Sequence, residues 1–410
     1  MNTIPLHNWA ESFSYSFKHC AFPQSLEDVQ EIVAKSPALK AVGSRHSFNL
    51  IADGSAAIVL QNVPISPVVE EDGKAVSIGA HATYGELCIF LKQHDLAIHN
   101  LASLPHISIA GAIATATHGS GDSNGNLATA VRAVEFVTAD GSVIRSRRGD
   151  AEFPGLVVHL GALGVMTRVT LDVERAFDVF QYVYEDLRWN AFLQNFDAIM
   201  GLGYSVSVFT DWGEKAGSIW VKSRAGSYSS EYFGATAAPV KRHPILGLDP
   251  RNCTDQLGIP GTWYERLPHF KMGFTPSNGE EIQSEFHVPR HQAAAAIEAL
   301  VSIRSTFAHL AQDGEFRTTA ADDLWMSPQY RQDTASIHFT WVRDASAVDT
   351  AVKTIERVLE PFDARPHWGK VFHAPSLVGR YAKHNDFRAL RDRMDPQRKF
   401  GNQWLIRAGL

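Results

Sequence analysis

The sequence predicts an α+β protein built from two domains. Its 410 residues exceed the usual length of one domain, so two are expected. Up to residue 174, helical and β-like segments are mixed without regular alternation, and no GxGxxG follows a strand, which disfavours a Rossmann domain. From residue 175, aromatic-rich β-like runs precede two long helical patterns. That order is typical of an antiparallel sheet with helices on one face.

Two helices of the first domain are predicted from their N-terminal signals. Ser25 followed by Asp28 fits a capping box at the start of SLEDVQEIVAKS. Thr83 with Glu86 fits a second box, which opens a helix through ELCIFLKQ. Between the two helices, AAIVLQNV and KAVSIGA are short β-like runs.

A β-hairpin is predicted at residues 131–147. Two strand-like runs meet there at Asp140 and Gly141, and Asp-Gly is a strong hairpin signal. A glycine-punctuated run at 157–173 then predicts the entry into another strand.

The second domain begins with three β-like runs, FDVFQYVYEDLRWNAF, YSVSVFTDWG and GSIWVKSR. The stretch from Ser227 to Gly279 is rich in Pro, Gly and polar residues and has little periodicity, so we expect a functional or covering segment there. Helical spacing returns at residues 290–310 and 345–362, with strand-like runs between the helices.

Composition and charge favour a cytoplasmic protein without a nucleic-acid partner. The net charge of −6 comes without a block of Lys and Arg, which argues against a nucleic-acid partner. Three scattered cysteines form neither a disulfide framework nor a metal-ligand pair. No signal peptide or apolar run of bilayer length is visible, so we expect no membrane partner. The sequence has no heptad pattern, and we expect a monomer.

Two loops of small residues in the first domain predict a dinucleotide ligand. Residues 41–49, AVGSRHSFN, place an arginine and a histidine after a glycine, and residues 101–129 consist mainly of small side chains. Bare backbone lets main-chain N–H groups approach an anion or a flat ring closely. Each loop alone is better explained as a turn over the core. Together, and with HLGALGV, they favour a bound dinucleotide.

Paired polar residues occur on two strand-like runs of the second domain. EFRT places Glu315 and Arg317 two residues apart, and IHFT places His338 and Thr340 in the same alternation, so each pair shares one face of a strand. Lys370 follows in HWGK. The pattern alone fits the solvent-facing side of two amphipathic strands at least as well as it fits a pocket.

The sequence predicts neither a metal site nor a serine nucleophile. The histidines at 287, 291, 309 and 384 show no HExxH or paired-carboxylate spacing. The GSG at residues 119–121 lacks the GxSxG context of a nucleophile elbow.

Several of these motifs resemble those of one flavoprotein family. GSRHSFN, SLPHISIAGAIATATHGSG and HLGALGVMTRV resemble the flavin-binding segments of the vanillyl-alcohol-oxidase (VAO/PCMH) type of FAD-binding fold. EFRT, ADDLWMSPQY, IHFTW and PHWGK resemble the bacterial alditol (xylitol) oxidase branch of that family, in the same order. The resemblance implies an FAD-binding domain at 1–174, to which residues 371–410 return, and a substrate-binding cap domain at 175–370.

The resemblance also implies which residues bind the cofactor. The histidine at position 46 is expected to form a covalent bond to the 8α-methyl carbon of the flavin, because a neutral imidazole is a competent nucleophile. The glycine and serines around it are expected to wrap the pyrophosphate. The full cofactor set is Gly43, Ser44, Arg45, His46, Ser47, Ser103, Ser108, Gly111, Thr115, Thr117, His118, Gly119, Gly161, Val165 and His373.

The polar residues of the second domain then become a substrate pocket. Arg317 and Lys370 are expected to contact the reacting hydroxyl and the flavin edge, and His338 is the candidate base. Glu315, Thr340 and, from the flavin domain, Ser103 are expected to bind polyol hydroxyls.

The function implied is an FAD-dependent oxidase that converts the terminal primary hydroxyl of an acyclic polyol to an aldehyde. Hydride would pass to flavin N5, and O2 would be reduced to H2O2. The nearest alternative is an aldonolactone oxidoreductase, whose ring substrate needs a broader and flatter pocket. A metal-dependent hydrolase and a non-catalytic flavin- or sugar-binding protein are more distant alternatives.

Overall fold

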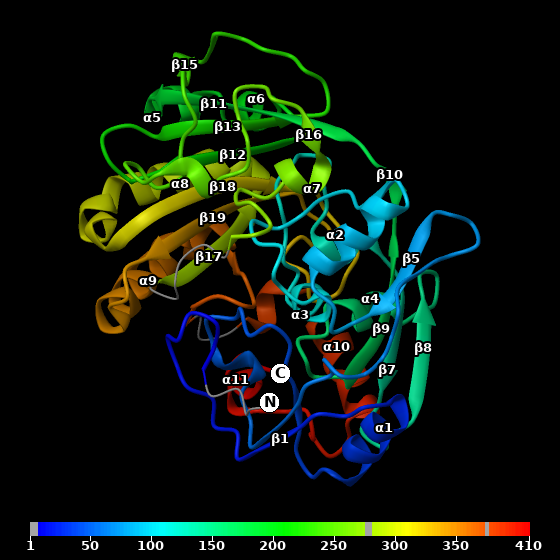
Figure 1. Cartoon of the computed structure of the whole chain (residues 1–410). Helices are drawn as coiled ribbons and strands as arrows, with labels where there is room; N and C mark the ends of the chain where they lie inside the picture. Colours follow the sequence, from blue (N-terminus) through cyan, green and yellow to red (C-terminus); the bar gives the residue numbers. More distant parts are fainter. Residues whose placement is uncertain (1–6, 275–280, 374–376) are drawn as a thin grey trace.

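The computed structural model describes residues 7–274, 281–373 and 377–410 (Figure 1). Two small sheets and a strand pair lie in the N-terminal part. A parallel three-stranded sheet has the order β1-β3-β2, and an antiparallel five-stranded sheet has the order β4-β5-β9-β7-β8. Their strands are β1 (His19–Ala21), β2 (Lys40–Ala41), β3 (Ala56–Ile58), β4 (Val68–Val69), β5 (Ala75–Gly79), β7 (Val131–Val137), β8 (Val143–Arg147) and β9 (Val165–Asp172), and the pair is β6 (Leu96–Ala97) with β10 (Glu174–Arg175).

The helices of this part begin where the sequence signals place them. Ser25 caps α1 by accepting from the Asp28 amide, and Thr83 with Glu86 forms the full reciprocal box at α2. The predicted hairpin is confirmed, since β7 pairs with β8 across a turn in which Gly141 has φ of +85°. The helices are α1 (Leu26–Lys35), α2 (Tyr84–Gln93), α3 (Ile109–Ala114) and α4 (Phe153–Val157).

A large antiparallel sheet dominates the rest of the chain. Its path is β14-β15-β11-β13-β12-β18-β19-β17-β20, and β16 also pairs with β11. The strands are β11 (Asp178–Leu187), β12 (Ser205–Thr210), β13 (Gly217–Ser223), β14 (Glu231–Tyr232), β15 (Ala235–Ala237), β16 (Gly261–Thr262), β17 (Ile282–Pro289), β18 (Ala311–Thr319), β19 (Thr334–Trp341) and β20 (Arg365–Pro366). The α+β class predicted from the sequence is confirmed.

Helices cover one face of the large sheet and leave the other for a cavity. Phe286, Phe316 and Phe339 point into the helix-covered core, while the residues between them along each strand point to the opposite face. Figure 1 shows α5, α8 and α9 beside this sheet. The helices are α5 (Trp189–Gln194), α6 (Phe196–Met200), α8 (Ala293–Ile303) and α9 (Ala345–Leu359), and α7 (Trp263–Arg266) lies at β16.

One β-like run predicted from the sequence ends earlier than expected. The strand stops at Leu187, and the residues after it form α5 and α6. Trp189, Phe192 and Phe196 recur three and four residues apart and are buried together, so helical spacing fills the core there. The covering segment contains only short elements, as expected, and its residues 275–279 lie outside the described residues.

The C-terminal segment lies against the N-terminal part. The Asn402 amide donates to the carbonyls of Leu50, Ile51 and Asp53, which ties the start of α11 (Gln403–Arg407) to that region, and α10 (His384–Met394) precedes it. The division into domains at residues 174 and 370 remains a prediction. Across the described ranges, no helix is both long and apolar enough to cross a bilayer.

Candidate active site

A cavity of about 570 Å³ lies between the small-residue loops and the polar face of the large sheet. Both parts of the chain contribute predicted residues to it. The lining includes Gly43, Ser44, Arg45, His46, Ser47, Ser103, Ser108, Gly111, Thr115, Thr117, His118 and Gly161 from the first part, and Glu315, Arg317, His338, Thr340 and Lys370 from the second. The covering segment adds Ile245, Phe270 and Phe274. The structure therefore joins two sets of residues that the sequence separates by about 200 positions.

Close packing fixes the two small-residue loops against each other. The Ser108 backbone amide donates to the Ser44 hydroxyl at 2.8 Å, which joins the main chain of one loop to a side chain of the other. A Cβ atom would lie 2.2 Å from Ser108 Oγ at Gly43 and 2.9 Å at Gly111, so neither position accepts a side chain without a shift. The result is a strip of bare backbone along the cavity wall.

The imidazole of His46 lines this cavity, and its ring nitrogens make no hydrogen bond within the described residues. Its ring stacks on Trp9 with centroids 4.9 Å apart. Both ring nitrogens are buried, and neither has a hydrogen-bond partner among the residues that the structure describes. Burial, with the positive charge of Lys370, lowers the pKa of His46 to about 3. The imidazole is therefore neutral at physiological pH, with a lone pair available to react or to bind.

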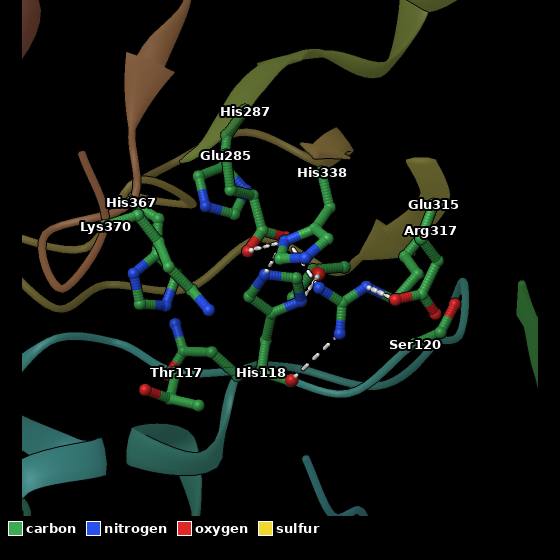
Figure 2. A network of polar contacts seen from close by, with 12 residues as sticks. Thr117, His118, Ser120, Glu285, His287, Glu315, Arg317, His338, His367 and Lys370 are labelled. Atoms are coloured by element: carbon green, nitrogen blue, oxygen red, sulfur yellow. Dashed lines mark hydrogen bonds and ion pairs between the residues drawn. The ribbon is translucent and has the colours of Figure 1, made fainter. Parts of the chain in front are cut away.

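On the sheet side, polar residues form cross-strand rows. Glu315 on β18 pairs with His338 on β19, and His338 pairs with Glu285 on β17. One step along the strands, Thr340 sits between Asp313 and Gln283 in the same way. The two-residue alternation of the sequence thus places these side chains on the cavity face. Figure 2 shows Glu285, His338 and Glu315 among them.

Glu285 is the centre of this polar network (Figure 2). Its carboxylate lies 2.7 Å from Arg317 Nη2, 3.0 Å from His118 Nε2 and 3.2 Å from His338 Nδ1. Burial, the largest single effect, opposes its ionisation, but Arg317, His118 and His338 together outweigh burial and hold the pKa of Glu285 well below its usual value. Sequence reasoning missed Glu285, although QSEFHVP carries the same polar alternation as EFRT.

The contact with Glu285 fixes the tautomer of His338. A carboxylate only accepts hydrogen bonds, so Nδ1 of the neutral imidazole must carry the hydrogen and Nε2 keeps the lone pair. The Thr340 hydroxyl lies 3.3 Å from that nitrogen and can donate to it. Burial lowers the pKa of His338, while Glu285 opposes the shift and Lys370 adds to it. The opposing charge comes from Glu285, the register partner of His338 on β17.

Glu315 has its own buried support, which sequence reasoning also missed. His269 Nε2 lies 3.0 Å from Glu315 Oε1, and Lys222 Nζ lies 3.2 Å from the other nitrogen of that ring. Arg317 and His269 outweigh the effect of burial and hold the pKa of Glu315 below its usual range. His269 comes from the covering segment, where the sequence has no periodicity to reveal it.

Lys370 supplies a second cation to the cavity, in addition to Arg317. It donates to the Gln283 side chain and lies 5.1 Å from the centroid of the Phe48 ring. Burial lowers the pKa of Lys370 to about 8, with Glu285 and Glu281 opposing that shift. The ammonium form therefore predominates at neutral pH.

Three predicted cofactor residues are not among the described residues that line the cavity. Val165 is buried in a core cluster beneath α1, and a side chain at Gly119 would collide with Asn100. His373 is exposed and lies 3.0 Å from Asp349. The resemblance matched whole motif segments, but only some residues of each segment line the cavity.

A cluster of possible metal ligands also lies in this network. One ligand atom from each of His118, Glu285 and His367 falls within 4.8 Å of the others. The Arg317 guanidinium already neutralises Glu285, and the Gly369 amide donates to His367 Nδ1. A divalent cation there would meet the positive charge of Arg317 at close range, which is unfavourable. The absence of a metal site remains a prediction.

Two family models match separate parts of the chain, and several relatives match nearly all of it. A family model described as "FAD binding domain" matches residues 17–147, and one described as "D-arabinono-1,4-lactone oxidase" matches residues 275–408. The alditol oxidase of Streptomyces sp. (strain IKD472 / FERM P-14339) is 44% identical, over 97% of either chain. The L-gulono-1,4-lactone dehydrogenase of Mycobacterium tuberculosis is 26% identical over 94% of either chain. The L-gulonolactone oxidase of Mus musculus is 24% identical, covering 98% of this chain and 97% of its own.

Solved structures share the fold at much lower sequence identity. A solvent-stable cholesterol oxidase superimposes with a TM-score of 0.78 at 14% identity, over 98% of this chain and 97% of its own. The cholesterol oxidase from B. sterolicum gives 0.72 at 15% identity, over 98% and 96%. The predicted VAO/PCMH type of fold is confirmed.

Proposed function

The chain belongs to the alditol oxidase family of FAD-dependent oxidoreductases, and we propose that it oxidises the terminal primary hydroxyl of an acyclic polyol, such as xylitol or sorbitol. The product would be the aldehyde, with O2 reduced to H2O2. One observation carries the proposal. Two cations, a neutral imidazole with a directed lone pair and a carboxylate all face the cavity that His46 also lines.

The described residues fit FAD. The strip of bare backbone at Gly43 and Gly111 leaves room for a pyrophosphate. The nitrogens of His46, which have no hydrogen-bond partner among the described residues, suit attachment of the isoalloxazine ring. When bound, FAD supplies the acceptor for a hydride from the alcohol carbon. We propose that His46 holds it covalently, and that Ser44, Ser47 and the other lining residues of the first part surround it.

The side chains on the cavity face of the sheet are proposed to transfer the proton, stabilise charge and bind the substrate hydroxyls. Nε2 of His338 accepts the proton of the reacting hydroxyl, while the Glu285 carboxylate holds the imidazole in the required tautomer. Arg317 and Lys370 stabilise negative charge that develops on the reacting oxygen, since Glu285 holds the first in place and Gln283 the second. Glu315, Thr340 and Ser103 are proposed to bind the neighbouring hydroxyls.

A lactone substrate is the second candidate, because the C-terminal third matches the D-arabinono-1,4-lactone oxidase model. The relatives named for lactones are the more distant ones, at 26% and 24% identity against 44%. A row of separate hydroxyl-binding groups along strands also suits an extended chain better than a ring. The cytoplasmic location and the monomeric state remain predictions of the sequence.

The proposed function is tested by oxygen consumption. Purified enzyme is given xylitol, sorbitol, mannitol, glycerol or an aldonolactone in an oxygen electrode. Uptake with the polyols is expected, and added catalase should return half of the oxygen consumed, because H2O2 is the reduced product. Uptake with the lactone alone would contradict the polyol assignment and favour the second candidate.

The covalent bond is tested without any turnover. After acid denaturation, the yellow colour is expected to stay with the precipitated wild-type protein, because His46 is bonded to the flavin. His46→Ala should fold, since the loops remain joined at Ser44 and Ser108, but should release its colour to the supernatant or carry none. His309→Ala, a change at an exposed histidine, is the control and should keep the colour. Wild-type protein that loses all colour on denaturation would overturn this assignment.

A further inference from the structure

The polar face of the large sheet continues beyond the residues assigned so far. Asp313 lies on β18 two residues before Glu315, and its register partner on β19 is Thr340. Regular pairing ends there, because the register shifts between Ala311 and Asp313. Two residues along a strand span about 7 Å. Asp313 therefore lines the cavity one row further from Arg317 than Glu315 and His338 do.

Asp313 is a buried carboxyl group with an unmet hydrogen-bonding capacity. The residue is 9% exposed, and its Oδ1 atom has no hydrogen-bond partner within the described parts of the chain. Burial raises the pKa of Asp313 to about 7; a hydrogen bond with Thr340 opposes the rise, while Glu315 and Glu281 add to it. A buried polar atom without a partner is costly, so such an atom facing a cavity is suited to a ligand.

We propose that Asp313 is a distal hydroxyl-binding residue that makes the site selective for long, uncharged polyols. The inference rests on the proposed function, because it takes the reacting end to lie at His338 and Lys370. Asp313 and His338 lie on neighbouring strands in adjacent rows, and a polyol of five or six carbons extends further along these rows than glycerol does. The longer polyols therefore place more hydroxyls within reach of Asp313.

The charges around Asp313 also determine which group at the distal end of the substrate the site accepts. Glu315 and Glu281 line the cavity together with Asp313 and raise its pKa, so the distal end of the site is lined by acidic groups. A hydroxyl donates to such a group, whereas a carboxylate is repelled by it. Sorbitol therefore fits better than gluconate, the six-carbon chain that ends in a carboxylate.

Asp313→Leu tests the hydroxyl contact. The ratio of kcat/KM for sorbitol to that for glycerol is expected to fall about tenfold, because the distal hydroxyl of the long substrate loses its partner. Asp323→Leu is the matched control, since that carboxylate is 72% exposed on the surface, and its ratio should not change. An equal fall for both substrates, or no change for either, would overturn the proposal.

Asp313→Asn tests the charge. The amide keeps the size of the side chain but cannot ionise, so the gluconate-to-sorbitol ratio of kcat/KM is expected to rise on the order of tenfold at pH 8, where most of the Asp313 carboxyl is charged, and by less at pH 6. An unchanged ratio would show that Asp313 does not select against carboxylates.

A binding measurement separates this inference from the proposed function. Without oxygen, sorbitol should raise the unfolding temperature of the wild-type enzyme more than glycerol at equal concentration, and Asp313→Leu should remove the difference. Failure of the wild type to consume oxygen with any polyol would contradict the oxidase assignment alone. A sorbitol preference that persists in Asp313→Leu, or that the wild type lacks, would overturn the role of Asp313.

Discussion

Replacing Lys370 by Met is expected to slow the anaerobic reduction of the enzyme by xylitol on the order of 10² to 10³-fold. Met keeps much of the volume of the side chain but removes the cation that Gln283 and the Phe48 ring hold in place. Stopped-flow absorbance of the flavin follows this half-reaction directly. Lys353→Met, at an exposed ion pair, is the control and should reduce at the wild-type rate.

Arg317→Met is expected to lose a similar factor in rate and also stability. The Arg317 guanidinium neutralises two buried carboxylates, Glu285 and Glu315, and a buried charge left unpaired costs about 3 to 5 kcal/mol of unfolding free energy. Urea unfolding should therefore distinguish the two variants. Near-normal reduction rates in both would place these cations outside the reaction site.

The pH dependence of the Lys370 effect has a defined sign. The pKa of Lys370 is lowered to about 8, so the cation is present below that pH and is lost above it. The wild-type reduction rate should fall on the alkaline side as a result, and Lys370→Met should lack that fall. An alkaline limb that survives in the variant would assign it to another group.

The sequence predicted most of the fold because its signals were local. Capping residues, the Asp-Gly turn and two-residue alternation each act within a few positions, and they marked α1, α2, the hairpin and the strands that carry Glu315 and His338. The run ending at Phe192 was misread because its aromatic residues satisfy both β propensity and helical spacing. Only the packed core selects the helix.

The part of the site that the sequence did not reveal consists of supporting contacts between distant segments. Glu285 contacts residues on three other segments, and Lys222 reaches Glu315 only through His269. No spacing along the chain encodes such contacts. The alternation of the polar residues Glu315, Arg317, His338 and Thr340 is a local signal, and the family resemblance was needed to assign them to a pocket, but the groups that set their charge depend on tertiary structure.

His338→Asn is expected to slow reduction by roughly 10² to 10⁴-fold, the range lost when a general base is removed. The asparagine can still hydrogen-bond Glu285 but cannot accept a proton at the position of Nε2. His309→Asn, at an exposed site, is the matched control and should retain the wild-type rate.

The acid side of the pH profile identifies the base. Burial lowers the pKa of His338 below its ordinary value of 6.5, and Glu285 opposes the shift. The neutral imidazole therefore predominates at neutral pH, and it is lost as the pH falls through the lowered pKa. The wild-type rate should therefore fall on the acid side, and the His338→Asn rate should be flat there. Thr340→Val removes the hydroxyl beside Nε2 and should keep the acid limb while weakening substrate binding. If the acid limb is unchanged in His338→Asn, the proton passes to another group, and Lys370 becomes the next candidate because its lowered pKa makes the neutral amine accessible.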